Sequence, residues 1–225
     1  RESILRIPIS EVFEPKCGCP ICRMREMLEQ RTVEYIMGAA MMEPDIRIET
    51  NRLGFCKEHY SMMLKQKNRL SLALMLQTHI DEVNKTAFAK KKRFEPKNSK
   101  QKKLTEINST CFVCSKVEWA MERLLKTFFE VYKDNDFRNL FNEQEYICLP
   151  HCDMLRSVAP NHLQKADLER FNDDCSALSK KYLDSLGCET EQFGYLDDKF
   201  YIEPTEKDLL MYGKMLCKPE ANGLR

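Results

Sequence analysis

The sequence predicts a mainly α-helical protein with little β-structure, organised as two tandem modules. Three observations predict this class. Seven of the 225 residues are glycine and 32% are charged, a balance that is typical of helical proteins. Apolar residues recur every three or four positions in several long segments. Finally, a set of four cysteine and histidine residues occurs twice, the second time 92 positions further along the chain.

The repeated set has the spacing of a metal site. Each copy reads C-x-x-C, then a gap of 33 residues, then C-x-x-H. Three thiols and one imidazole are the ligands of a closed, tetrahedral structural zinc site. The sequence therefore predicts two structural Zn²⁺ ions per chain, one in each copy. The predicted ligands are Cys19, Cys22, Cys56 and His59 in the first copy and Cys111, Cys114, Cys148 and His151 in the second.

The two copies also share residues outside the ligand set. Residues 19–62 align without gaps on 111–154, and this alignment pairs Glu26 with Glu118. We interpret the two stretches as diverged copies of one module that arose by internal duplication. The expected organisation is a first zinc-binding helical module (1–84), a basic linker (85–108), a second zinc-binding helical module (109–188) and a C-terminal extension (189–225).

In the first module, a helix is expected from Pro20 onward, because apolar residues follow at helical spacing and a first turn tolerates proline. The alternating segment D-I-R-I-E-T-N, residues 45–51, suggests a short extended piece. Gly54 then provides a turn, and a second helix is expected over residues 57–84.

In the second module, a clear apolar stripe after Cys114 predicts a long helix. The next helix is broken at Pro160 and resumes over 165–186. In the extension, the aromatic stretch F-G-Y-L-D-D-K-F-Y-I precedes a last helix over 206–217, where Thr205 and Asp208 have capping-box spacing.

The basic charge is concentrated in one segment. Residues 85–103 hold nine lysines or arginines and a single acid, Glu95, although the whole chain carries a net charge of +1. The segment lacks apolar periodicity and contains Pro96, which is typical of an exposed linker. Contact with nucleic acid is the alternative interpretation.

Other chemistries of cysteine fit this pattern less well than structural zinc. A catalytic zinc ion normally has three protein ligands and an open position, whereas each copy supplies four. An iron–sulfur cluster would need Cys17, which is not duplicated, whereas His59 is. A thioredoxin-like pair requires a strand–helix–strand pattern that is absent. The remaining five cysteines are expected to be non-ligands: Cys17, Cys152, Cys175, Cys188 and Cys217.

The sequence contains no phosphate-binding glycine loop, nucleophile elbow or paired-carboxylate motif, so a non-enzymatic protein is expected. No visible signal peptide and no apolar run of 18 residues are present; the longest, residues 70–76, is too short to cross a membrane. Metal-type cysteine spacing and an odd number of cysteines favour a reducing compartment, and hence the cytoplasm.

The segments I-P-I-S-E-V-F-E, C-P-I-C and P-D-I-R-I-E-T-N-R-L-G-F-C-K-E-H-Y resemble a family of uncharacterised bacterial proteins, a domain of unknown function with a C-P-x-C…R-x-x-T-N-x-x-G-F-C-x-x-H motif. The resemblance implies a bacterial cytosolic protein and supplies no activity. The second copy departs from the motif, with Glu145, Tyr146 and Ile147 in place of Leu53, Gly54 and Phe55. The matching residues are Cys19, Pro20, Cys22, Arg47, Thr50, Asn51, Gly54, Phe55, Cys56 and His59.

Two functions are consistent with these features. The first is a zinc-binding helical scaffold or interaction module that binds another, unidentified protein. The second is a zinc-dependent nucleic-acid-binding regulator that uses the basic segment 85–103. A metal or redox sensor, in which Cys17 and Cys152 exchange with ligands, is a third option. Arg47, Thr50 and Asn51 are expected to brace the zinc site by hydrogen bonds, with a polar binding feature as the alternative.

Overall fold

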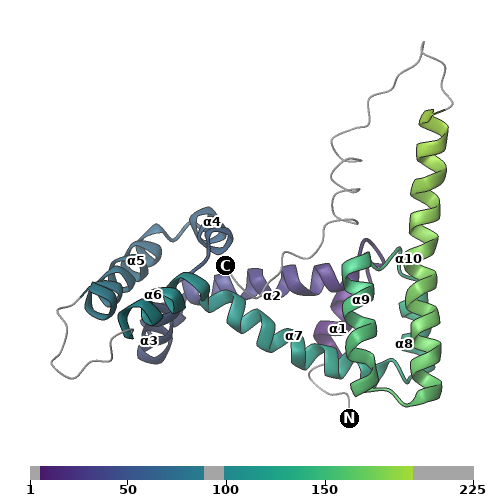
Figure 1. The fold of residues 1–225 in the computed structure, drawn as a ribbon, viewed down its shortest axis with the longest axis horizontal. Coiled ribbons are helices and arrows are strands. Elements are labelled where there is room, and N and C mark those ends of the chain that lie inside the picture. The colour runs from purple at the N-terminus through teal and green to yellow at the C-terminus, as the bar shows by residue number, and fades with distance from the viewer. Residues whose placement is uncertain (1–5, 89–98, 195–225) are drawn as a thin grey trace. The chain divides into compact units, whose positions relative to one another are not determined.

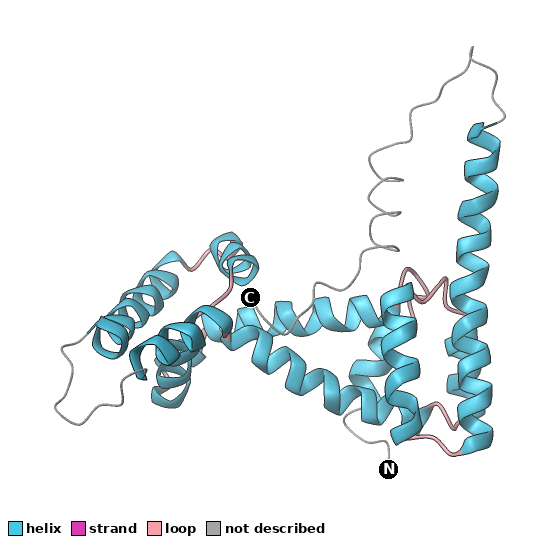
Figure 2. Ribbon diagram, in the orientation of Figure 1, coloured by secondary structure: helices cyan, strands magenta, loops and turns pink. Residues whose placement is uncertain are grey.

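A computed structural model describes residues 6–88 and 99–194 of the chain. Within these two ranges the protein forms ten α-helices joined by loops and short helical turns, with no strand (Figure 2). The predicted mainly α-helical class is therefore confirmed. The predicted last helix, 206–217, lies outside the described residues.

The helices follow one another in two series of five (Figure 1). Helices α2 and α7 begin 92 residues apart, and so do α4 and α9, which is the spacing of the repeated ligands. The first series is α1 (Arg6–Phe13), α2 (Pro20–Met37), α3 (Pro44–Leu53), α4 (Lys57–Lys65) and α5 (Arg69–Val83); the second is α6 (Ser99–Ser109), α7 (Phe112–Val131), α8 (Asn135–Asn142), α9 (Leu149–Val158) and α10 (Lys165–Gly194).

Tertiary contacts divide the chain into two compact units, whose boundaries differ from those of the modules expected from the sequence. Among the described residues, unit one comprises 6–24 and 122–194, and unit two comprises 25–88 and 99–121. The division falls inside α2 and inside α7. Unit one thus combines α1 with α8, α9 and α10, whereas unit two combines α3, α4 and α5 with α6. Each unit draws its helices from both series, which differs from the expected modules 1–84 and 109–188.

Two local expectations in the first module are corrected. Residues 45–51 are not extended but lie in α3, where Pro44 occupies the first turn and the buried Thr50 and Leu53 share one face at helical spacing. The expected helix 57–84 is two helices, α4 and α5. The break is stabilised by Asn68, whose side chain accepts a hydrogen bond from Ser71 N and donates one to Met37 O.

The segment expected as a basic linker is partly helical. Residues 84–88 form one turn of π-helix and residues 99–109 form α6. On α6, Leu104 and Ile107 are half-buried, and Glu106 forms an ion pair with Arg52 of α3 at 3.3 Å. Residues 89–98 lie outside the described part of the chain.

Unit one has an aromatic core. Phe13 of α1 stacks on Phe128 of α7 with ring centroids 5.6 Å apart, and Tyr132 meets Phe171 of α10 edge-on at 4.9 Å. Such pairs stabilise a fold beyond the area that they bury. The aromatic side chains with 0–1% exposure in this unit are Phe13, Phe128, Phe129, Tyr132, Phe141 and Phe171.

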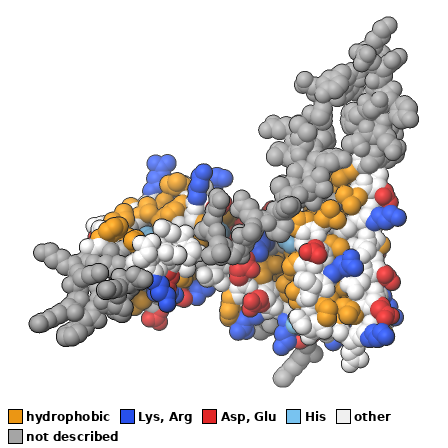
Figure 3. Space-filling view, viewed as in Figure 1, with side chains coloured by type: hydrophobic (Ala, Val, Ile, Leu, Met, Phe, Trp, Pro, Cys, Tyr) orange, Lys and Arg blue, Asp and Glu red, His pale blue; other side chains and the backbone are white. Residues whose placement is uncertain are grey.

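Unit two has a core of aliphatic side chains and methionine. Within its described residues, Phe112 is the one aromatic side chain that is fully buried. The other aliphatic and methionine core positions are Val33, Ile36, Met37, Ala40, Leu53, Met63, Leu72, Met75, Val113, Val117 and Met121. Large apolar side chains are also exposed here, including Leu70, at 70%, and Leu74 on α5. Figure 3 shows hydrophobic side chains gathered over α5.

No described helix has the combination of length and apolar character that a membrane span requires.

Candidate metal centres

All eight predicted ligands are brought together in the structure, in two groups of four. Within each group, the ligand atoms lie within 4.8 Å of one another, so each group could hold a metal ion. The Cys19 group lies in unit one and the Cys56 group in unit two. The Cys19 group is Cys19, Cys22, Cys148 and His151, and the Cys56 group is Cys56, His59, Cys111 and Cys114.

This grouping corrects the sequence-based assignment of one site to each copy. The C-x-x-C pair of the first copy meets the C-x-x-H pair of the second, and the reverse pairing forms the other group. The gap of 33 residues within a copy therefore does not close onto one site. The correction has a physical reason: long α2 and α7 carry the chain from one compact unit into the other between the two ligand pairs of each copy.

The Cys56 group has tetrahedral dimensions. His59 Nδ1 lies 3.1 Å from Cys56 Sγ, 3.4 Å from Cys111 Sγ and 3.5 Å from Cys114 Sγ. The sulfur atoms of Cys56 and Cys114 are 3.9 Å apart. Around a tetrahedral Zn²⁺, bond lengths of about 2.3 Å to sulfur and 2.0–2.1 Å to nitrogen imply separations of roughly 3.8 Å between sulfurs and 3.5 Å between sulfur and nitrogen.

The Cys19 group repeats this geometry. His151 Nδ1 lies 3.1 Å from Cys148 Sγ, 3.3 Å from Cys22 Sγ and 3.5 Å from Cys19 Sγ. Cys22 and Cys148 have their sulfurs 3.8 Å apart. In both groups the ring nitrogen that faces the three sulfurs is Nδ1, so the two groups present the same donor set.

Each group lies where two helices begin. Cys56 is the N-cap of α4 and Cys148 is the N-cap of α9. At α2 and α7, Cys19 O and Cys111 O accept from the amides of residues 23 and 115, which marks the first turn. Free amides and the positive end of the helix dipole at these positions stabilise thiolates.

The thiols of each group change one another's pKa. A hydrogen bond from Cys114 lowers the pKa of Cys111 to about 3, whereas burial raises the pKa of Cys56 to about 11. Burial also acts to lower the pKa of His151, but hydrogen bonds to Cys148 and Cys19 outweigh it and raise that pKa to about 9. Crowded thiols share protons in this way, and a bound dication would stabilise all the thiolates together.

The outer nitrogen of one histidine faces a carboxylate. His59 is 4% exposed, its Nε2 has no hydrogen-bond partner, and Glu29 Oε1 lies 3.8 Å from it. Burial raises the pKa of Glu29. A carboxylate behind a metal-ligating histidine orients the ring and increases its basicity, and Glu29 is placed for this role.

The motif residues before Cys56 brace the loop that carries it. Arg47 donates to Thr78 Oγ1 at 2.8 Å, and Thr78 donates to Asn51 Oδ1 at 2.7 Å, which ties α3 to α5. His79 Nδ1 donates to Asn51 O at 2.7 Å. Gly54, at φ 61°, closes α3. These contacts match the expected bracing role.

The same loop is attached directly to the start of α7. Phe112 N donates to Gly54 O at 2.9 Å, and Thr110 Oγ1 donates to Leu53 O at 3.0 Å. These two bonds hold the residues next to Cys111 against those next to Cys56. They fix the approach of the two ligand pairs.

The corresponding loop of the Cys19 group is held by other contacts. Pro20, which corresponds to Phe112, has no N–H, so the equivalent bond cannot form. Gly18 N instead donates to Glu145 Oε2, and Ser179 Oγ on α10 donates to Ile147 O at 2.7 Å. The departure from the motif in the second copy thus changes the support of the ligands and leaves their geometry intact.

The other described cysteines lie outside both groups. Cys17 is exposed and accepts a hydrogen bond from Arg23 at 2.9 Å. Cys152 and Cys175 are buried and touch each other. Their contact was not evident from the sequence, because 22 residues separate them and only the packing of α9 on α10 brings them together. The side chain of Cys188 and all of Cys217 lie outside the described residues.

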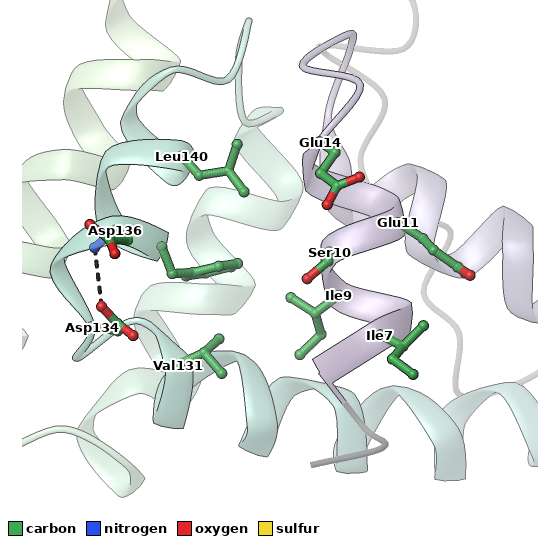
Figure 4. A pocket seen from close by; sticks show the side chains of 10 residues that line it. Ile7, Ile9, Ser10, Glu11, Glu14, Val131, Asp134, Asp136 and Leu140 are labelled. Atoms are coloured by element: carbon green, nitrogen blue, oxygen red, sulfur yellow. Dashed lines mark hydrogen bonds between the residues drawn. The ribbon is translucent and has the colours of Figure 1, made fainter. Parts of the chain in front are cut away.

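An open groove of about 530 Å³ lies between α1 and α8 in unit one (Figure 4). Its wall combines buried Ile9 and Val131 with half-buried Phe137 and Leu140. Carboxylates surround this apolar wall, and the lining includes no lysine, arginine or histidine. The acidic residues in the lining are Glu11, Glu14, Asp134 and Asp136, all exposed.

A family model described as "Family of unknown function (DUF6062)" matches residues 1–208, so the chain belongs to that family. No curated protein matches the chain. No solved structure matches it either.

Gly54→Ala is expected to destabilise the protein more than Gly18→Ala. Both glycines have φ near +60°. An alanine at this φ is strained by about 1–3 kcal/mol. A Cβ on Gly54 would in addition lie 2.8 Å from the His79 ring, whereas a Cβ on Gly18 would have its nearest neighbour at 3.9 Å. The clash adds about 1–3 kcal/mol. Urea unfolding of the two variants measures the difference, and equal losses would contradict the role given to His79.

Paired substitutions test the exchanged grouping. Cys22→Ser with Cys148→Ser removes two ligands of one group, so one metal ion per chain should remain. Cys22→Ser with Cys56→Ser damages both groups, so no tightly bound metal should remain. Elemental analysis of the purified variants measures the content. A site within each copy would give the opposite result, with two losses for the first pair and one for the second.

Proposed function

We propose that this member of a family of unknown function is a non-enzymatic zinc-binding helical protein, in which each Cys₃His group holds one structural Zn²⁺. The observation that carries the proposal is the convergence of four ligand atoms within 4.8 Å in each group. Four protein ligands complete a tetrahedral coordination shell, which is typical of structural zinc and differs from the open shell of a catalytic ion.

The donor set supports zinc over other metals. Three thiolates with one imidazole in a tetrahedron suit Zn²⁺, whereas calcium and magnesium prefer oxygen ligands. Cys17, the additional thiol that an iron–sulfur cluster would need, is not a member of the Cys19 group. Because the ligands need to remain reduced, we propose a cytoplasmic location.

Each ion would join helix starts that are distant in the sequence. Cys19 and His151 are separated by 132 positions, and Cys111 and His59 by 52. Closing loops of this length costs chain entropy. Apparent binding energies of structural zinc in small peptides, about 10–16 kcal/mol at neutral pH, exceed this cost. The ions would therefore stabilise the helix arrangement in both units.

We further propose that the chain acts as an interaction module for another protein, through the groove between α1 and α8. The occupant that fits is a basic amphipathic segment. An apolar side chain would contact Ile9, Phe137 and Leu140, and lysine or arginine would pair with Glu14 and Asp136. The support is charge complementarity, because four carboxylates and no cation line the groove.

The alternative is a nucleic-acid-binding regulator that uses the basic segment 85–103. This alternative is supported by the high density of lysine in the segment. Ten residues of the segment, 89–98, lie outside the described part of the chain. The acidic groove would repel phosphates. Binding to generic DNA and RNA at increasing salt separates the two proposals, because phosphate contacts weaken steeply with salt.

Purified protein is expected to hold two zinc ions per chain and to show no visible iron absorbance. Chelation should expose the amides of α3, α4 and α5 to hydrogen exchange more than those of α8, α9 and α10. The reason is that unit one retains an aromatic core without the ion, whereas unit two has one fully buried aromatic side chain among its described residues. One ion per chain, or equal loss of protection in the two units, would contradict this account.

Charge reversal in the groove should abolish partner binding. Glu14→Lys with Asp136→Lys removes the proposed cation contacts, and the matched control, Glu122→Lys with Glu130→Lys, makes the same charge change at exposed positions of α7. In affinity capture from the native cell, basic partners should bind the control and not the groove variant. Equal capture by both variants would exclude the groove as the binding site.

A further inference from the structure

Two thiols that belong to neither metal group lie in direct contact. Cys152 on α9 and Cys175 on α10 have their sulfurs 3.2 Å apart, and their side chains are 6% and 0% exposed. Two sulfur pairs of the metal groups, Cys22–Cys148 and Cys56–Cys114, lie further apart, at 3.8 and 3.9 Å. A disulfide bond needs about 2.05 Å, so an approach of roughly 1 Å would join Cys152 to Cys175.

We propose that Cys152 and Cys175 are a disulfide-forming pair that reacts with hydrogen peroxide while the metal groups retain their ions. The Cys152 sulfur attacks one peroxide oxygen; an S–O bond forms, the O–O bond breaks, and the leaving hydroxide takes the Cys152 thiol proton to become water. Cys175 sulfur then attacks Cys152 sulfur, the S–O bond breaks, and a second water leaves. Two thiols together lose two electrons and two protons, and one peroxide becomes two waters.

The order of the two steps follows from exposure. Cys152 retains 6% of its exposure, whereas Cys175 is fully buried beside it. Cys175 therefore acts as the resolving thiol. The contact distance makes the second step fast relative to further oxidation of Cys152, because its partner is already in place.

A disulfide between Cys152 and Cys175 would affect the Cys19 group, because Cys152 lies next to one of its ligands. Cys152 directly follows the ligand His151 on α9, and Ser179 on α10 already holds Ile147 of the loop before α9. A disulfide would be a covalent tie between the same two helices. If the zinc proposal holds, the oxidised protein should therefore release the ion of the Cys19 group to a chelator more slowly than the reduced protein.

The other series provides an internal control. The position that corresponds to Cys152 is Tyr60, so the equivalent disulfide cannot form in that series. The Cys56 group has no such tie, so oxidation should leave the release of its ion unchanged. Oxidation should thus slow the release of one of the two ions and leave the release of the other unchanged.

The test uses the full-length protein with its metal bound, treated with one equivalent of hydrogen peroxide. Expected results are the loss of two thiols per chain, a peptide linking Cys152 to Cys175 in non-reducing mass spectrometry, and unchanged metal content. A chromogenic chelator should then release one ion several-fold more slowly. Cys17→Ser should behave like the unmodified chain, whereas Cys175→Ala should show neither the linked peptide nor the slower release.

Two results would overturn the proposal. The first is a peptide map in which peroxide modifies Cys17 or links ligand cysteines, with metal release, before any Cys152–Cys175 peptide forms. The second is the linked peptide without slower release of one ion. The peptide map of the unmodified chain decides the first point even if Cys175→Ala folds poorly. Metal content other than two in untreated protein would refute the zinc proposal alone, because the linked peptide is measured independently of metal.

Discussion

The structure depends on bringing two C-x-x-C pairs and two C-x-x-H pairs together across long stretches of chain. In each group, the histidine nitrogen lies 3.1–3.5 Å from the three sulfurs and one pair of sulfurs is 3.8 or 3.9 Å apart, close to the edges of a tetrahedron around a zinc ion. Every pair lies at the beginning of a helix, so meeting at one point fixes where two helices start. Because the pairs come from different copies of the motif, neither copy can complete a site alone in this arrangement.

The two units are stabilised by different interactions in addition to their ligand groups. Unit one adds an aromatic core, centred on Phe128 and Phe171, to its ligand group, and α10 supports the ligand loop through Ser179. Unit two relies on aliphatic side chains, on the hydrogen bonds of Arg47 and Asn51, and on the attachment of Gly54 to the start of α7. A structural ion therefore has more to contribute in unit two. Unit two has exposed apolar side chains and unit one has an acidic groove, so the surfaces of the two units differ in character.

Much of the fold and the candidate site was predictable, and the failures have identifiable causes. Helices α2, α7 and α10 have long apolar stripes, and all eight candidate ligands follow from spacing alone. Residues 45–51 are helical and not extended as predicted, because Pro44 favours a helix start and the burial of Thr50 and Leu53 outweighs a short alternating pattern. Helices α1, α6 and α8 are short or polar, and their stability comes from contacts that no local pattern reveals.

The sequence by itself determined the helical class, the identity of the eight candidate ligands and their equal spacing in two copies, because residue type and periodicity are local properties. Only the tertiary structure decided which ligands meet. Spacing specifies that Cys22 and Cys56 are 34 positions apart, but it does not specify whether α2 turns back or continues into another unit before Cys56 is reached. The same holds for Cys152 and Cys175, whose contact exists because α9 packs on α10. Pairings between distant segments follow from the burial of whole helix faces, which is a property of the assembled core.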